Sequence, residues 1–191
     1  MDEKEVLNIF RESGALLEGH FELRSGLHSG SFFQCAEVLC YPRLAEQLCA
    51  ELVRRIQAEL GDAADVDTVV APAMGGIAVG HEVGRAMNKR SIFIEKQDGV
   101  LVMRRFKVAE GERVIIAEDV VTRGGRVQES IDILEKSGAK IEAIALLVDR
   151  SGGKASFDYP TFSLLKMEPV AYELGNCPLC DEGLELVHPG S

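Results

Sequence analysis

The sequence predicts an α/β protein in which helices flank a parallel β-sheet. Short apolar runs, typical of buried strands, alternate along the chain with longer segments whose apolar residues recur at helical spacing. Two of these apolar runs lead into glycine-bearing turns followed by a helical pattern, which is how the strand-to-helix connections of a parallel sheet begin. No internal repeat or low-complexity linker divides the chain. We therefore expect one domain over residues 1–191.

The part of the chain before the sheet predicts two helices joined by extended segments. Extended pieces are expected at residues 20–25 and 31–39. Pro42 then begins a long helix that runs to about Leu60. Proline is favourable in the first turn, because the N–H that it lacks would have no hydrogen-bond partner there. The apolar positions that indicate the N-terminal helix are Val6, Ile9, Phe10 and Leu17.

The sheet and its helices follow from the alternation of periods. The turn signal at Gln97, Asp98 and Gly99 lies between two alternating runs and predicts a hairpin arm that projects from the sheet. After the last strand we expect an irregular tail. The predicted strands are residues 67–71, 91–95, 114–117, 143–148 and, at an edge, 161–167, and the predicted helices are residues 77–87 and about 127–136.

Composition limits the partners and the location of the protein. With 191 residues and 46% hydrophobic content the chain can build a full core. A net charge of −10 argues against a nucleic-acid partner but permits a local basic pocket for a small anion. Because no apolar run has the length of a membrane span and the first residues are acidic rather than signal-like, we expect no membrane association and a cytoplasmic location. The residues of such a basic pocket would be Lys96, Arg104, Arg105 and Lys107.

The five cysteines are scattered and do not form a disulfide framework. Cys177 and Cys180 form a Cys-x-x-Cys pair, which is half of a zinc site or a redox pair. There is no second pair, and only His188 follows downstream. The favoured interpretation is an idle or weakly redox-active pair in a C-terminal turn. The alternative is a metal shared across a subunit interface.

The most informative stretch is residues 114–127. Glu118 and Asp119 follow an apolar run and precede Gly124 and Gly125, which open the next helix. Glycines let the backbone approach a ligand, and the amides of a helix N-terminus attract anions, so this turn predicts a phosphate cradle. The carboxylates could accept hydrogen bonds from ribose hydroxyls or hold a hydrated Mg²⁺. The alternative is a solvated acidic pair before an ordinary turn.

This stretch resembles the phosphoribosyl pyrophosphate (PRPP) motif of the type I phosphoribosyltransferases, in which apolar residues precede two acidic residues, two apolar residues, a threonine and a glycine-containing loop. Two positions depart from it. Arg123 stands where the family usually has Thr or Ala, and Arg126 where a Ser or Thr hydroxyl usually faces the 5′-phosphate, although either arginine can bind phosphate as a charge-assisted donor. The PRPP-binding residues implied by the resemblance are Met74, Gly75, Lys96, Arg104, Arg105, Glu118, Asp119, Val120, Val121, Thr122, Arg123, Gly124, Gly125 and Arg126.

The resemblance also implies an architecture. It is a parallel sheet with a core at about residues 60–150, a small hood from about residues 1–40 and 155–191, and a mobile arm at residues 95–108. The turn at residues 72–76 resembles the family's pyrophosphate-binding loop, although a plain strand-to-helix turn is an alternative.

Residues 21–33 resemble the signature of the orotate phosphoribosyltransferases, where Phe-x-Leu-[Lys/Arg]-Ser-Gly precedes a Ser and two aromatics. The alternative is a hairpin with two core phenylalanines and an exposed arginine. Aromatic faces pack a planar pyrimidine, and arginine pairs with its carboxylate. The orotate-binding residues that the resemblance implies are Arg24, Phe32, Phe33, Thr122 and Arg150, the last in a turn at residues 149–153. The arm, and the tail from Cys177 to Gly190, are similar to those of the compact bacterial and archaeal members.

The resemblance implies the reaction of orotate with PRPP to give orotidine 5′-monophosphate and pyrophosphate, a step of pyrimidine (UMP) biosynthesis. Lys96 and Asp119 would be catalytic, with Mg²⁺ bound mainly through PRPP, or also through Glu118 or Asp119 by way of water. A homodimer is expected, since in relatives the arm closes over the neighbouring subunit's site. The alternatives are a phosphoribosyltransferase for another nucleobase, and a PRPP-binding regulator or inactive paralogue.

Overall fold

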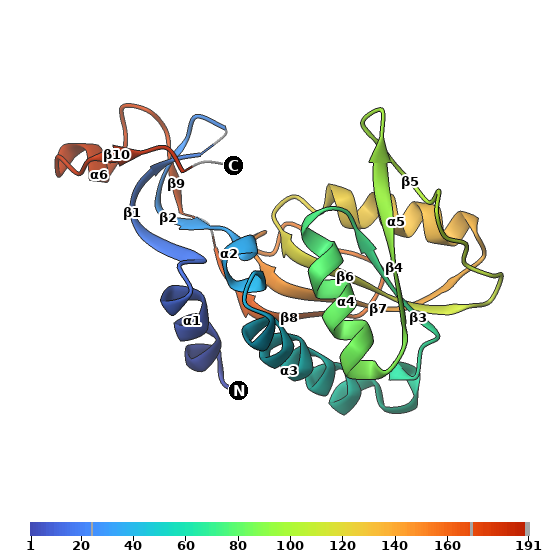
Figure 1. Cartoon of the computed structure of the whole chain (residues 1–191). Coiled ribbons are helices and arrows are strands. Elements are labelled where there is room, and N and C mark those ends of the chain that lie inside the picture. Colours follow the sequence, from blue (N-terminus) through green and yellow to red (C-terminus); the bar gives the residue numbers. More distant parts are fainter. Residues whose placement is uncertain (24, 169, 190–191) are drawn as a thin grey trace.

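A computed structural model of the chain describes residues 1–23, 25–168 and 170–189. Its strands form two separate sheets (Figure 1). The six-stranded sheet has the order β5-β4-β3-β6-β7-β8, and the four-stranded sheet has the order β10-β1-β2-β9. We call the second one the terminal sheet, because its strands come from the two ends of the chain.

The six-stranded sheet is parallel except for one edge strand, which confirms the predicted α/β class. β3, β4, β6, β7 and β8 pair in parallel, and β5 runs antiparallel to β4. The strands are β3 (Thr68–Pro72), β4 (Arg90–Gln97), β5 (Val100–Val102), β6 (Arg113–Val121), β7 (Lys140–Asp149) and β8 (Thr161–Lys166).

The helices cover both faces of this sheet, and successive residues of β6 alternate between the two faces. Ile115 packs into a core shared with α1, α3 and α4, whereas Ile116 packs into the core beneath α5. The helices are α1 (Glu3–Glu12), α2 (Cys35–Leu39), α3 (Pro42–Leu60), α4 (Gly75–Met87), α5 (Gly125–Lys136) and α6 (Pro178–Asp181), with a 3₁₀ turn at Gly61–Ala64. Pro42 is the first helical residue of α3, as predicted. None of the described helices is both long and apolar enough to span a membrane.

The hairpin arm is formed by β4 and β5, as the turn signal predicted. β3 pairs with β4 only as far as Ile94, so residues 95–97 pair with β5 alone. The arm therefore extends beyond the sheet, where it rises from the end of β4 (Figure 1). Asp98 and Gly99 at its tip have positive φ values of 52° and 85°, as a tight hairpin turn requires.

The terminal sheet joins the N-terminal hairpin to the C-terminal tail. β1 (Leu16–Glu22) and β2 (His28–Phe33) are antiparallel. β10 (Leu186–Val187) pairs in parallel with β1, and β9 (Ala171–Tyr172) pairs antiparallel with β2. The two C-terminal strands have only two residues each, so the C-terminal tail gains little from backbone pairing with β1 and β2.

Several predicted elements were wrong at their ends. The helix expected to include Leu17 ends at Glu12, and Leu17 belongs to β1. Cys35–Leu39 form α2 rather than an extended piece, because Cys35 and Val38, one turn apart, bury the same side. The tail is not wholly irregular, since it contains β9, α6 and β10. These differences depend on contacts with distant parts of the chain.

Candidate active site

A cleft of about 730 Å³ opens at the carboxyl end of β6, where ligands bind in open α/β sheets. Its walls come from the β6–α5 turn, the start of α4, the end of β2 with α2, and the residue that follows β7. Of the predicted site residues, those that line this cleft are Phe32, Phe33, Gly75, Glu118, Asp119, Val120, Val121, Thr122, Arg123, Gly124, Gly125, Arg126 and Arg150.

The two carboxylates lie within β6, not after it, which corrects the predicted end of the strand at residue 117. β6 continues to Val121 because it stays paired with β7 up to Asp149. The Glu118 side chain is 2% exposed, and its Oε1 accepts a hydrogen bond from the Asp119 amide at 3.1 Å. Asp119 Oδ1 accepts from the Val120 amide at 2.8 Å.

The start of α4 packs directly on these carboxylates, and only glycine fits there. A Cβ at Gly75 would lie 2.6 Å from Asp119 Oδ2, and one at Gly76 would lie 2.9 Å from Glu118 Oε1. The turn at residues 72–76 is therefore part of the same site as the acidic pair. Met74 is 82% exposed and does not contact the cleft, whereas Gly75 lines it.

Burial and the neighbouring Asp119 charge favour the protonated form of the Glu118 carboxyl group. Burial of its side chain, followed by the neighbouring Asp119 charge, raises the pKa of Glu118 to about 9. Arg126 opposes this shift, but weakly. The ligand-free site at neutral pH thus holds a neutral Glu118 beside Asp119, and a cation entering the cleft would favour release of the proton.

The turn after β6 has the form of an anion-binding cradle. Gly124 has φ of 78°, and a Cβ on it would lie 2.9 Å from the Phe157 ring, so both its backbone and its surroundings require glycine. No side chain caps the first turn of α5. Its amides therefore remain available at the positive end of the helix dipole. Arg123 and Arg126 are exposed at this end of the cleft and form no ion pair with any described residue.

The opposite end of the cleft combines aromatic rings with a cation. The Arg150 guanidinium carbon lies 5.9 Å from the centroid of Phe33, within cation–π range. The Arg150 side chain is half-buried, and burial lowers its pKa, although the nearby Cys35 opposes this shift. No described carboxylate lies within ion-pair distance of it. The Phe32 ring lies tilted against Phe21, with the two ring centroids 5.9 Å apart. A partly desolvated cation beside an aromatic face is suited to a planar anion.

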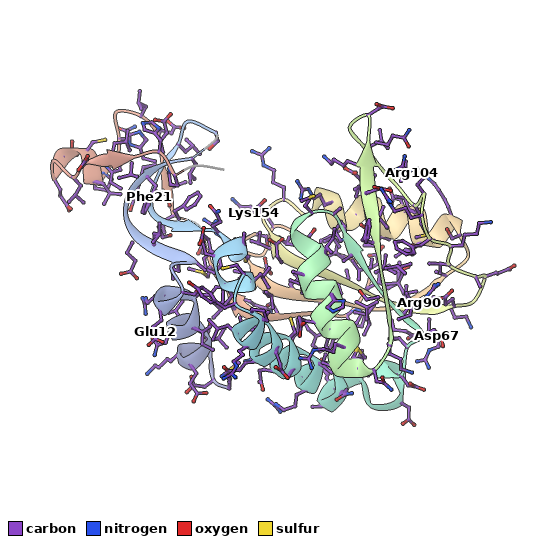
Figure 2. The ribbon with its side chains drawn as sticks, viewed as in Figure 1. Glu12, Phe21, Asp67, Arg90, Arg104 and Lys154 are labelled. Atoms are coloured by element: carbon purple, nitrogen blue, oxygen red, sulfur yellow. The ribbon has the colours of Figure 1, made fainter. Side chains whose placement is uncertain are left out.

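The basic residues of the arm do not reach this cleft. Lys96 is exposed on β4, and Arg104 and Arg105 both pair with Glu95, at 3.2 and 2.9 Å. Figure 2 shows Arg104 on the arm, on the other side of the molecule from Phe21 in the terminal sheet. The role predicted for these residues stays a prediction. Arg24 lies outside the described residues.

Sequence reasoning missed part of the cleft wall. Cys35 lies at the start of α2, and its Sγ donates to the Asp119 carbonyl at 3.7 Å. Burial, followed by the Asp119 charge, raises the pKa of this thiol, which keeps its proton for that contact. The only feature of the sequence that indicated a place for Cys35 in the cleft wall was its position two residues after Phe33. Other cleft residues not predicted are Glu22, Leu23, Gln34, Ala36, Val127, Glu129 and Pro189.

Comparison with known proteins decides the family. The model of the phosphoribosyl transferase domain matches residues 42–177. The orotate phosphoribosyltransferase of Heliobacterium modesticaldum is 47% identical over 192 aligned residues, which cover 100% of this chain and 99% of that protein. The orotate phosphoribosyltransferase of Caldicellulosiruptor bescii is 44% identical, and the alignment covers 100% of this chain and 98% of that protein. The chain belongs to the orotate phosphoribosyltransferase family.

Solved structures of phosphoribosyltransferases share the fold. The orotate phosphoribosyltransferase of Aeropyrum pernix superposes with a TM-score of 0.71 at 23% identity, covering 84% of this chain and 93% of that one. The adenine phosphoribosyltransferase of Thermoanaerobacter pseudethanolicus superposes with a TM-score of 0.58 at 19% identity, covering 72% of this chain and 88% of that one. The fold is thus common to phosphoribosyltransferases of different bases, and full-length sequence identity places this chain in the orotate phosphoribosyltransferase family.

Proposed function

We propose that this protein transfers the phosphoribosyl group of PRPP to orotate, giving orotidine 5′-monophosphate and pyrophosphate for pyrimidine biosynthesis. The observation that carries this proposal is the half-buried Arg150 beside the Phe33 ring, in the same cleft as an uncapped helix N-terminus. A carboxylate on a flat pyrimidine fits the first feature, and a ribose phosphate fits the second.

The cleft divides into three zones under this proposal. The amides of residues 122–126, with Arg123 and Arg126, hold the 5′-phosphate. Glu118 and Asp119 face the ribose hydroxyls from β6. Phe32, Phe33 and Arg150 hold the base, and Thr122 approaches it from the other side. The order phosphate, ribose, base then runs from the start of α5 to the end of β2.

Transfer at the anomeric carbon builds positive charge on the ribose ring, as in other glycosyl transfers. Asp119 lines the cleft, and in this proposal its negative charge stabilises that ring. Glu118 holds a proton in the ligand-free protein, and the developing cation lowers the cost of its ionisation.

The donor set fits a Mg²⁺ ion that is held mainly by the substrate. The carboxylate pair offers oxygen donors to this part of the cleft, and burial favours a proton on Glu118, which leaves few charged ligands for an ion held by the protein alone. Mg²⁺ bound to pyrophosphate oxygens would stabilise the departing charge. Asp119, directly or through water, is the residue best placed to orient such a complex.

The basic arm would act by closing over a cleft. We propose that Lys96, Arg104 and Arg105 contact the pyrophosphate when the arm moves, and that the Glu95 pairs hold it open without substrate. Because none of these three basic residues lines the cleft of its own chain, the arm suits a homodimer in which each arm serves the neighbouring subunit. A cytoplasmic location remains the expectation for such an enzyme.

The decisive experiment is a spectrophotometric assay of orotate consumption with PRPP and Mg²⁺, run in parallel with uracil and adenine. Arg150→Gln should reduce kcat/KM for orotate roughly ten- to a hundredfold, since a charge-assisted pair is lost, while PRPP binding is kept. Arg43→Gln, which changes an exposed arginine of α3, is the matched control. Equal activity of the two variants would remove Arg150 from the base site, and consumption of another base but not of orotate would overturn the proposed function.

A further inference from the structure

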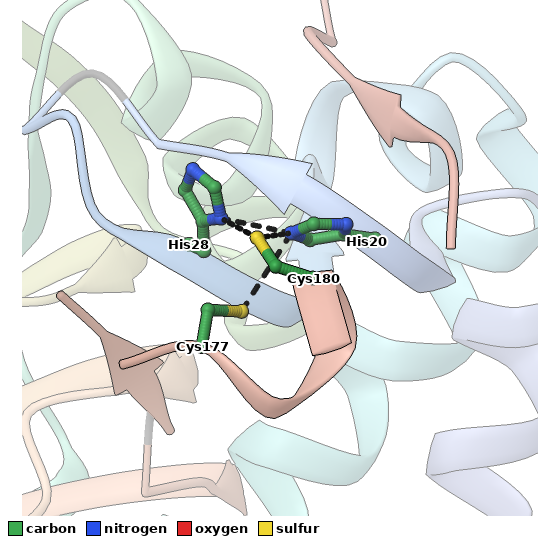
Figure 3. A group of neighbouring side chains, drawn as sticks. All are labelled: His20, His28, Cys177 and Cys180. Atoms are coloured by element: carbon green, nitrogen blue, oxygen red, sulfur yellow. Dashed lines mark hydrogen bonds between the residues drawn. The ribbon is translucent and has the colours of Figure 1, made fainter. Parts of the chain in front are cut away.

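Four metal-binding side chains meet in the terminal sheet, away from the cleft. His20 lies on β1 and His28 on β2, while Cys177 immediately precedes α6 and Cys180 lies within it. One ligand atom from each residue lies within 4.8 Å of every other. Figure 3 shows the four side chains pointing toward a common centre. His20, His28 and Cys177 are buried, and Cys180 is exposed.

The spacing of these atoms is close to that of a tetrahedral site. Ligands about 2.0–2.3 Å from a central zinc ion stand roughly 3.3–3.8 Å from one another. Cys180 Sγ lies 3.3 Å from His28 Nδ1 and 3.7 Å from His20 Nε2, and Cys177 Sγ lies 3.7 Å from His20 Nε2. Only the separation of the two ring nitrogens, 2.8 Å, is shorter, and it must open by about half an ångström to admit an ion.

The hydrogen bonding of His20 prepares it as a ligand. Its Nδ1 lies 2.9 Å from the Leu184 carbonyl, which can only accept, so Nδ1 carries the proton. The lone pair of Nε2 is then directed at the other three side chains. A ligand histidine commonly donates its remote N–H to a backbone carbonyl in this way. His28 Nε2, by contrast, is buried without a partner among the described residues, so the only polar contacts described for the His28 ring are those of Nδ1 with His20 and Cys180.

We propose that His20, His28, Cys177 and Cys180 bind one Zn²⁺ ion as a closed structural site. Two imidazoles and two thiolates are a ligand set typical of structural zinc. Binding displaces one proton from each thiol, and the two thiolates neutralise the ion, so the site carries no net charge. All four positions of the tetrahedron are filled by protein, which leaves none for a substrate. His188, the downstream histidine noted in the sequence, instead lies 3.3 Å from Glu22.

The position of the site explains what the ion would do. The C-terminal segment contacts the rest of the terminal sheet through two-residue strands, and three of its apolar side chains, Leu174, Leu184 and Val187, are 76%, 47% and 45% exposed. A metal would fasten this segment to β1 and β2 where apolar burial does not. β2 runs from His28 directly to Phe32 and Phe33 in the cleft. The ion would therefore hold the wall of the proposed base site in place.

The first test is metal content. The full chain, purified without chelator under reducing conditions, should contain about one zinc per chain by mass spectrometry of the metals. Cys180→Ser should lose most of it, whereas Cys180→His, which restores a nitrogen ligand, should retain it. Cys40→Ser, at an exposed cysteine outside the cluster, and His188→Gln are the controls. Replacement by Co²⁺ should give the visible absorption of a tetrahedral thiolate site in the parent chain and not in Cys180→Ser.

Two results obtained with the parent chain would overturn the proposal. One is a parent chain that contains no zinc and binds none when titrated with Zn²⁺ under reducing conditions. The other is a Cys177–Cys180 disulfide in freshly prepared protein, found by mass spectrometry of its peptides. Retention of zinc by both Cys180→Ser and His28→Gln would equally remove the ion from this cluster.

The effect of the metal on the cleft is tested separately, and this second test rests on the proposed function. Cys180→Ser should raise KM for orotate more than KM for PRPP, since the terminal sheet supplies the base wall and not the phosphate cradle. If Cys180→Ser loses its zinc but keeps the same KM for orotate, the ion does not support the base site. The proposal that the parent chain binds zinc would still stand. Conversely, a chain that binds zinc but consumes no orotate would retain the metal site and lose the proposed function.

Discussion

Replacing Glu118 with Gln should stabilise the ligand-free protein, and the gain should depend on pH. The substitution keeps the shape of the side chain and the oxygen that accepts from the Asp119 amide at 3.1 Å. It removes the ionisable group whose pKa burial and the Asp119 charge raise from 4.5 to about 9. The parent chain must either keep a proton on Glu118 or bury a second negative charge beside Asp119.

The size of the effect follows from linkage between folding and proton binding. A carboxyl group whose folded-state pKa is raised stabilises the fold fully only below its unfolded pKa, and this contribution is lost as pH rises toward the folded pKa. For Glu118 the window runs from about 4.5 to about 9. Each pKa unit corresponds to about 1.36 kcal/mol, so at pH 7 the parent chain has lost roughly 3 kcal/mol through this group. The neutral amide of the Glu118→Gln variant carries none of this penalty.

Chemical denaturation followed by circular dichroism would measure this difference. Parent and Glu118→Gln chains should have similar midpoints near pH 4.5, and the variant should become increasingly more stable as pH rises to 8. Glu59→Gln, at an exposed glutamate on α3, controls for the loss of a surface charge. A gain that is the same at both ends of the range, or no gain at pH 8, would show that Glu118 is not protonated in the folded chain, and the electrostatic description of the acidic pair would fail.

Three further predictions concern the reaction. Asp119→Asn keeps shape but removes the charge facing the ribose, so kcat should fall roughly a hundredfold or more with little change in thermal stability, and unchanged turnover would refute the role. Lys96→Ala should lower kcat by a similar factor. Mixing it with Asp119→Asn should restore activity to heterodimers if arms act between subunits, whereas no recovery indicates an arm that serves its own chain. Arg126→Ser should weaken PRPP binding measured by calorimetry, since a charge-assisted donor is lost, and tighter binding would identify the arginine as an obstruction.

The sequence by itself determined the parts of this protein that depend on local pattern. Alternating periods predicted the α/β class, Pro42 marked the first residue of α3, and Asp98 with Gly99 marked the tip of the arm. The acidic pair and the glycines of residues 118–125 predicted the family, which the relatives confirm, because such a motif encodes its chemistry within a few consecutive residues.

Only the tertiary structure decided what depends on residues far apart in the chain. β6 extends through Asp119 because β7 pairs with it, and Cys35 enters the cleft because α2 brings its Sγ to the Asp119 carbonyl near the end of β6. The partners of Cys177 were beyond prediction for the same reason. His20 is 157 residues away, and His28 stands on a different strand, so no spacing in the sequence joins them to the cysteine pair. The spacing of apolar residues predicts which side of a helix or strand is buried. Which residues that side contacts depends on the packing of the whole chain.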